Sequence, residues 1–108
     1  SPAAAAANRR EERKREAQER ARIAALQKPL KARLEKIDRE MERVNAAIGE
    51  MDALIGDPDW YSAAGSEEIA RITRERGESA ARLDELELEW LDVSEKLEAC
   101  AAAPADPA

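Results

Sequence analysis

The sequence predicts an all-α protein, a two-helix antiparallel coiled-coil hairpin that is preceded by a basic helical linker. Two stretches carry apolar residues at alternating steps of three and four, the spacing of heptad core positions. A short segment with Gly and Pro separates these stretches, so the second helix must fold back on the first. Charged residues make up 39% of the chain and aromatic residues 3%, a balance typical of long, exposed helices.

Residues 1–22 are predicted to form a basic linker or tether that is partly disordered, because they have almost no apolar face. Residues 1–36 contain 11 Lys or Arg and 5 Asp or Glu, a net charge of +6, whereas residues 37–108 carry −12. This asymmetry indicates a polyanionic partner near the basic end. Two interpretations remain open: the alternating charges form solvated i,i+4 pairs, or they contact the phosphates of RNA or DNA.

The first hairpin helix is predicted over residues 23–56. Its core positions follow one another without interruption at steps of four and three: Leu30, Leu34, Ile37, Met41, Val44, Ile48, Met51 and Ile55. Ile23 and Leu26 extend the apolar stripe toward the N-terminus. Pro29 lacks an amide hydrogen and predicts a kink or a helix restart.

A tip loop is predicted over residues 57–66, and a second helix over residues 67–100. Gly56 is expected to end the first helix in the left-handed conformation, and Ser66 to cap the second. The second series of core positions is Ile69, Ile72, Arg76, Ser79, Leu83, Leu86, Trp90, Val93, Leu97 and Cys100. Trp90 falls in this series and is therefore predicted to be a core residue. Residues 101–108 are predicted to be a disordered tail, since they consist of Ala, Pro and Asp.

The chain lacks the residues that most catalytic and metal sites need. It contains no His and a single cysteine, Cys100, and none of its 4 Gly lies in a phosphate-binding loop. We therefore expect no catalytic residue, metal or cofactor here. No segment approaches 18 consecutive apolar residues, so no membrane span is expected. One unpaired cysteine is compatible with a reducing cytoplasm.

Two groups of residues are candidates for contact with partners. The nucleic-acid candidates are the basic residues of the first third of the chain: Arg9, Arg10, Arg13, Lys14, Arg15, Arg20, Arg22, Lys28, Lys31 and Arg33. The partner-contact candidates lie at the hairpin tip: Asp57, Pro58, Trp60 and Tyr61. The two tip aromatics either dock on a partner or fold back over Leu54 and Ile55 to close the apolar seam.

Several of these features together resemble the C-terminal coiled-coil domain of bacterial ABC-F ATPases. The resemblance spans residues 9–99 and rests on the basic linker, Pro29-Leu30, the heptads through Ile55, and the motifs near the tip and the end. These motifs are Asp57-Pro58 followed by Tyr61, and Glu89-Trp90-Leu91 before Leu97.

The resemblance implies a cytoplasmic parent ATPase with two tandem cassettes that bind ATP and Mg, acting in translation near the ribosomal tRNA exit site. This chain would be its non-catalytic C-terminal domain, contacting ribosomal RNA or the ribosome, or DNA, with the isolated fragment a monomer. The charge of −12 over residues 37–108 argues against a general DNA-binding surface on the hairpin. The alternative is a purely structural spacer or dimerisation module that binds no nucleic acid.

Overall fold

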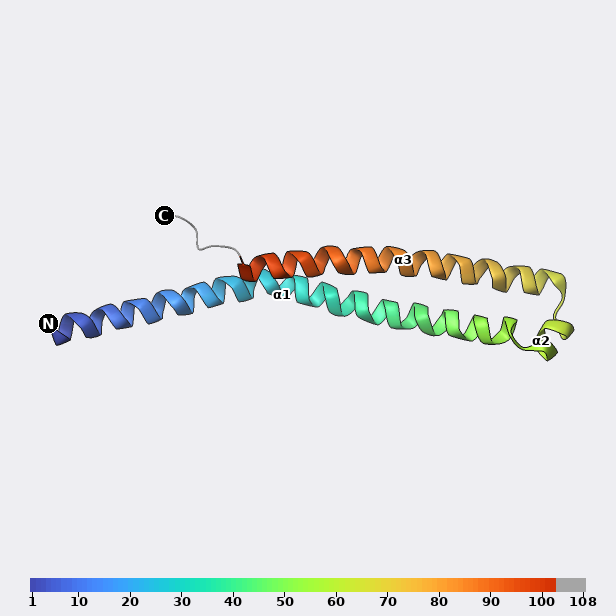
Figure 1. Ribbon diagram of the computed structural model, residues 1–108, viewed down its shortest axis with the longest axis horizontal. Helices are drawn as coiled ribbons and strands as arrows, with labels where there is room; N and C mark the ends of the chain where they lie inside the picture. The colour runs from blue at the N-terminus through green and yellow to red at the C-terminus, as the bar shows by residue number, and fades with distance from the viewer. Residues whose placement is uncertain (103–108) are drawn as a thin grey trace.

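The computed structural model describes residues 1–102 and contains three helices in that range, with no β-strand among the described residues. They are α1 (Pro2–Ile55), α2 (Pro58–Ala63) and α3 (Ser66–Ala102). The chain runs along α1, turns at α2 and returns beside α1 along α3 (Figure 1). The molecule is very elongated, with extents of 88 × 22 × 15 Å. The predicted all-α class is confirmed.

α1 is one continuous helix of 54 residues, so the predicted helix start at residue 23 is wrong. Residues 2–22 are helical rather than partly disordered. Ser1 caps the helix by accepting a hydrogen bond from the amide of Ala4 at 3.2 Å, and Pro2 occupies the first turn, where no amide hydrogen is needed. Residues Ala3–Ala7 are all alanine, the residue type with the highest helix propensity. Local preference therefore carries the helix through a segment that has no apolar face.

Pro29 lies inside α1 and does not restart the helix. α1 changes direction gently beside the C-terminal end of α3 (Figure 1). Proline removes one backbone hydrogen bond and crowds the preceding turn, which bends a helix that stays helical when its neighbours are strong helix formers.

The predicted tip loop contains a short helix, α2. The Asp57 carboxylate accepts a hydrogen bond from the amide of Asp59 at 3.0 Å, and Pro58 fits the first helical position. Gly56 is not left-handed: its φ of −82° and ψ of −6° are right-handed helical values, and its amide donates to the Asp52 carbonyl at 2.9 Å. α1 therefore keeps right-handed helical backbone angles through Gly56, and the chain changes direction at Asp57, whose backbone is extended.

α3 begins one residue earlier than predicted. Ser66 is its first residue rather than its cap, and the Gly65 carbonyl accepts the first helical hydrogen bond, from Ile69 at 3.1 Å. At the other end, Ala101 and Ala102 belong to α3, contrary to the predicted tail. The remainder of that predicted tail, residues 103–108, lies outside the described residues.

The apolar seam lies between α1 and α3. All eight predicted core positions from Leu30 to Ile55 are buried or half-buried. Three of the four buried residues, Ile37, Leu86 and Val93, cluster in the half of the hairpin nearest the end of α3, with exposures of 5%, 0% and 0%. Leu30, Leu34, Met41 and Val44 pack around this cluster. The fourth buried residue, Ile72, is 6% exposed and lies nearer the tip.

Two residues predicted to lie in the seam are exposed rather than buried, although more than half of the surface of each is covered. Trp90 is 39% exposed, so its prediction as a core residue is wrong, and Leu26 is 46% exposed. The neighbouring core positions Leu86 and Val93 are fully enclosed, so exposure of the seam of α3 differs from one position to the next. Leu26 lies near the end of α3, where few partner residues remain to cover it.

Candidate nucleic-acid interface and hairpin tip

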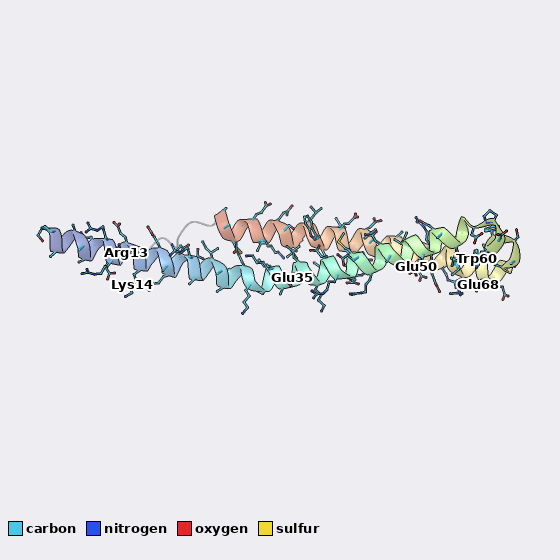
Figure 2. The ribbon with its side chains drawn as sticks, turned by 90° about the horizontal axis from the view of Figure 1, so that it is seen from below. Arg13, Lys14, Glu35, Glu50, Trp60 and Glu68 are labelled. Atoms are coloured by element: carbon cyan, nitrogen blue, oxygen red, sulfur yellow. The ribbon has the colours of Figure 1, made fainter. Side chains whose placement is uncertain are left out.

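All ten basic candidates lie on α1, and five of them lie on the part that projects beyond α3. Figure 2 labels Arg13 and Lys14 on this projecting part. Counting back from the contact between Glu40 and Arg82, the last residue of α3 lies level with about residue 20. Nine of the ten side chains belong to exposed residues, and only Arg22 is half-buried. The structure thus places the candidates along one helix.

Arg22 differs from the other nine because it forms an ion pair. Its guanidinium donates two hydrogen bonds to the Glu19 carboxylate, at 2.6 and 3.0 Å. These bonds hold the pKa of Glu19 below its usual value, because they favour the charged carboxylate. None of the other nine forms an ion pair within residues 1–102. Those nine cations are available to an external anion.

Two ion pairs join α1 to α3 across the seam. Arg82 donates two hydrogen bonds to Glu40, both 3.0 Å long, and Arg76 donates to Asp52 at 2.8 and 3.3 Å. Each arginine lowers the pKa of its carboxylate partner, first through these hydrogen bonds and then through its charge. Sequence reasoning missed both pairs. The polar position of Arg76 in the seam was the signal that could have revealed one of them.

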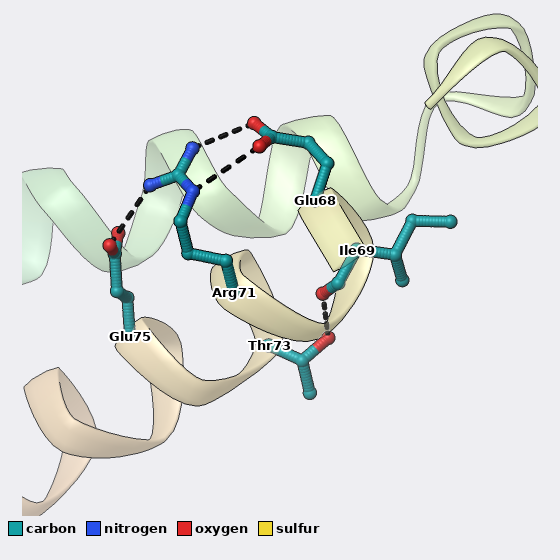
Figure 3. A network of polar contacts seen from close by, with 5 residues as sticks. All are labelled: Glu68, Ile69, Arg71, Thr73 and Glu75. Carbon is teal, nitrogen blue, oxygen red and sulfur yellow. Dashed lines mark hydrogen bonds and ion pairs between the residues drawn. The ribbon is translucent and has the colours of Figure 1, made fainter. Parts of the chain in front are cut away.

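A third network lies within the first turns of α3 (Figure 3). Arg71 donates to Glu68 at 2.7 and 3.2 Å and to Glu75 at 2.9 Å, while the Thr73 hydroxyl donates to the Ile69 carbonyl at 2.8 Å. Exposed pairs of this kind, three and four residues apart, support the helix locally. This network belongs to α3 alone and forms no binding site.

The hairpin tip presents one exposed and one partly covered aromatic ring. Tyr61 is 50% exposed and Trp60, labelled in Figure 2, is half-buried. Leu54 beside them remains 37% exposed, so the tip aromatics do not seal the end of the seam. The Asp57 side chain is used in the cap of α2. The tip thus keeps an apolar surface that a partner can contact.

Leu88 and Leu91 on α3 form a further exposed feature that was not predicted. Their exposures are 68% and 51%, although each is a large apolar residue. Both fall between the heptad core positions of the second series, and this mismatch was the available signal.

Comparisons with known proteins give no relative for this chain. Neither the protein-family models, nor the curated proteins, nor the solved structures contained a match. Among residues 1–102, no helix combines the length and the hydropathy needed to cross a membrane.

Proposed function

We propose that the chain is a non-catalytic interaction domain whose projecting basic helix binds the phosphates of nucleic acid. One observation carries this proposal: nine of the ten candidate cations are exposed and form no ion pair within residues 1–102, and they lie on one helix, five of them beyond the end of α3. Binding to phosphates releases the counterions condensed on the nucleic acid, which favours such a surface. The rest of the chain carries a net charge of −12 and repels phosphate, so contact is directed to the basic end.

In this proposal α1 and α3 form an antiparallel coiled coil that serves as a rigid arm. The uninterrupted series of buried and half-buried positions from Leu30 to Ile55 supports it. The ion pairs of Glu40 with Arg82 and of Asp52 with Arg76 fix the register between the helices. An arm of this kind holds the basic helix at one end and the apolar tip at the other.

The resemblance to the C-terminal domain of ABC-F ATPases suggests the ribosome as the partner. The parent would be a cytoplasmic ATPase with ATP and Mg in its cassettes, and residues 1–22 would be the tether that follows the second cassette. Ribosomal RNA would then contact the basic helix, while Trp60 and Tyr61 would dock on ribosomal protein or RNA. Only the sequence motifs around Pro29, Asp57 and Trp90 support this part of the proposal.

A salt titration tests the proposed binding. Fluorescence anisotropy of the whole chain with structured ribosomal RNA and with duplex DNA, between about 50 and 200 mM salt, should give an affinity that falls steeply with salt. Replacing Arg9, Arg10, Arg13, Lys14 and Arg15 with Gln should remove most of this affinity. If the wild-type chain binds neither nucleic acid at the lowest salt, the proposal is wrong.

The second candidate function is a structural spacer without nucleic-acid affinity. The length of 88 Å favours it, because a long, narrow rod can separate two domains without any ligand. A dimerisation module has less support, because the seam is already filled within one chain by contacts such as Ile37 with Leu86. Sedimentation equilibrium distinguishes the two: a spacer has the mass of 11.9 kDa and a dimer has twice that mass.

A further inference from the structure

The basic residues of α1 divide into two groups that face opposite sides of the helix. Arg9, Arg13, Arg20 and Lys31 follow one another at steps of 4, 7 and 11 residues, each close to a whole number of helical turns. Arg10, Lys14 and Lys28 lie beside them, within a sector of about 140° at 100° per residue. We call these seven residues the outer stripe. Each of the other three, Arg15, Arg22 and Arg33, lies about 200° around the helix from a stripe residue.

The opposite side of the projecting helix is acidic. Glu12, Glu16 and Glu19 precede Ile23 at steps of 4, 3 and 4, so they continue the side of α1 that faces α3 further along. Between Arg9 and Lys31, no acidic residue falls within the sector of the outer stripe. The stripe ends at Glu35, one turn beyond Lys31, which Figure 2 labels.

The side chains of the outer stripe are also free to bind. All seven belong to exposed residues, and none makes an ion pair within the part of the chain that the structure describes. In the opposite group, Arg22 is held by Glu19, and Arg15 lies three or four residues from three carboxylates, those of Glu11, Glu12 and Glu19. Arg9, Arg13 and Arg20 of the outer stripe each have one carboxylate at that spacing. Phosphate approaching that side would meet carboxylates as well as guanidinium groups.

We propose that the outer stripe binds the phosphate backbone of a double-stranded nucleic acid along its length, and that Arg15, Arg22 and Arg33 take no part. This inference rests on the proposed function and specifies its ligand and its contact residues. From Arg9 to Lys31 the stripe is about 33 Å long, close to one turn of a duplex. A continuous helix keeps its cations at fixed spacings, which matches the regular phosphates of a duplex better than a flexible single strand.

One feature argues for contact on the backbone rather than insertion into a groove, and a second argues for a duplex rather than a single strand. A helix in the major groove has phosphates on both sides, so Glu12, Glu16 and Glu19 would lie close to one row of them. Residues 1–33 contain no aromatic side chain that could stack on the bases of a single strand. Binding should therefore be independent of base sequence and tighter for a duplex than for a single strand.

The sequence offers a matched pair of variants to test this inference. R13Q/R20Q/K31Q changes three residues of the outer stripe. R15Q/R22Q/R33Q changes three residues with the same spacing, each two positions further along, and alters the net charge equally. Because R22Q also breaks the pair with Glu19, a second matched pair, R13Q/K31Q and R15Q/R33Q, leaves that contact intact. Circular dichroism should confirm that all four variants keep the helical content of the wild type.

The measurement is the anisotropy of a labelled duplex of about two helical turns, compared with its separated strands, at about 100 mM salt. We expect R13Q/R20Q/K31Q to weaken duplex binding at least about tenfold and to reduce the slope of log affinity against log salt by about 2 to 3. R15Q/R22Q/R33Q should stay within about twofold of the wild type. Equal losses in the two triple variants, or tighter binding of the single strand, would overturn the inference and leave the proposed function standing. A wild-type chain that binds no nucleic acid would overturn both.

Discussion

Two regions of α1 are helical for different physical reasons. Residues 30–55 lie beside α3, and every predicted core position there is at least half-buried. Most of residues 2–22 project beyond α3, and almost all of their side chains are exposed. The first region is stabilised by packing, whereas the second depends on a capped start, a run of alanines and the ion pair of Arg22 with Glu19. The comparison indicates that the seam provides the stability of the protein, while the projecting helix provides its charged surface.

Removing a buried side chain from the seam between α1 and α3 should have the largest effect. Leu86 is fully enclosed, so Leu86→Ala should lower the free energy of unfolding by roughly 2–5 kcal/mol. Leu88→Ala is a matched control, because Leu88 is 68% exposed, and it should change stability by less than about 0.5 kcal/mol. Urea denaturation followed by circular dichroism measures both. Similar losses in the two variants would show that the seam is not the source of stability.

Pro29 lies between the two regions and should weaken the helix that joins them. Pro29→Ala restores an amide hydrogen at an exposed helical position, so we expect it to stabilise the protein by up to about 3 kcal/mol. Thermal unfolding should show a higher Tm. A lower Tm would indicate that the change of direction in α1 is needed for packing against α3.

Glycine substitutions should distinguish packing from local preference. Ala47→Gly, in the part of α1 that lies beside α3, should reduce the global free energy of unfolding by about 1 kcal/mol. Ala17→Gly in the projecting region should cause a similar local loss of helix but leave global unfolding unchanged. Amide hydrogen exchange resolves the two, since local fraying and global unfolding expose different amides to exchange. If Ala17→Gly also lowered global stability, the projecting helix would be coupled to the hairpin.

The ion pair between Glu40 and Arg82 should give a smaller, pH-dependent effect. Because Arg82 lowers the pKa of Glu40 in the folded state, the pair stabilises the fold above the usual pKa of about 4.5. That stabilisation is lost as the pH falls through the lowered folded-state pKa. Glu40→Gln should therefore lower the Tm at pH 7, and its difference from the wild type should shrink below pH 4.5.

Glu42→Gln serves as the control for this measurement. Glu42 is exposed and forms no ion pair within residues 1–102, so its substitution should leave the Tm nearly unchanged. A Glu40→Gln difference that stayed constant with pH would mean that the carboxylate charge does not stabilise the hairpin.

The sequence contained most of the fold because the seam has a strict period. The steps of three and four from Leu30 to Ile55 located the buried side of α1 without error. The same period placed Trp90 in the core although it is 39% exposed, because spacing alone does not tell how far a side chain is covered. The segment before residue 23 was predicted as a separate, partly disordered helical linker because it has no apolar stripe, whereas Ser1, Pro2 and the alanines that follow begin one continuous helix without a stripe.

The candidate site was predicted less completely than the fold. Its ten basic residues were visible as composition, but the two faces emerge only when α1 is one helix from Pro2 to Lys31 and beyond. The pairing of Arg22 with Glu19 depends on rotamers, and the sequence allowed several partners for each cation. The exposure of Leu88 and Leu91 required knowledge of which side of α3 meets α1.

The most direct test of the central claim is an amide chemical-shift map of the whole chain on titration with a short RNA duplex at low salt. The account predicts shifts confined to residues 9–33, with the largest beside the outer stripe, and none along the acidic surface of α3. Shifts centred on the tip around Trp60 or on Leu88 and Leu91, with the basic helix unchanged, would contradict it.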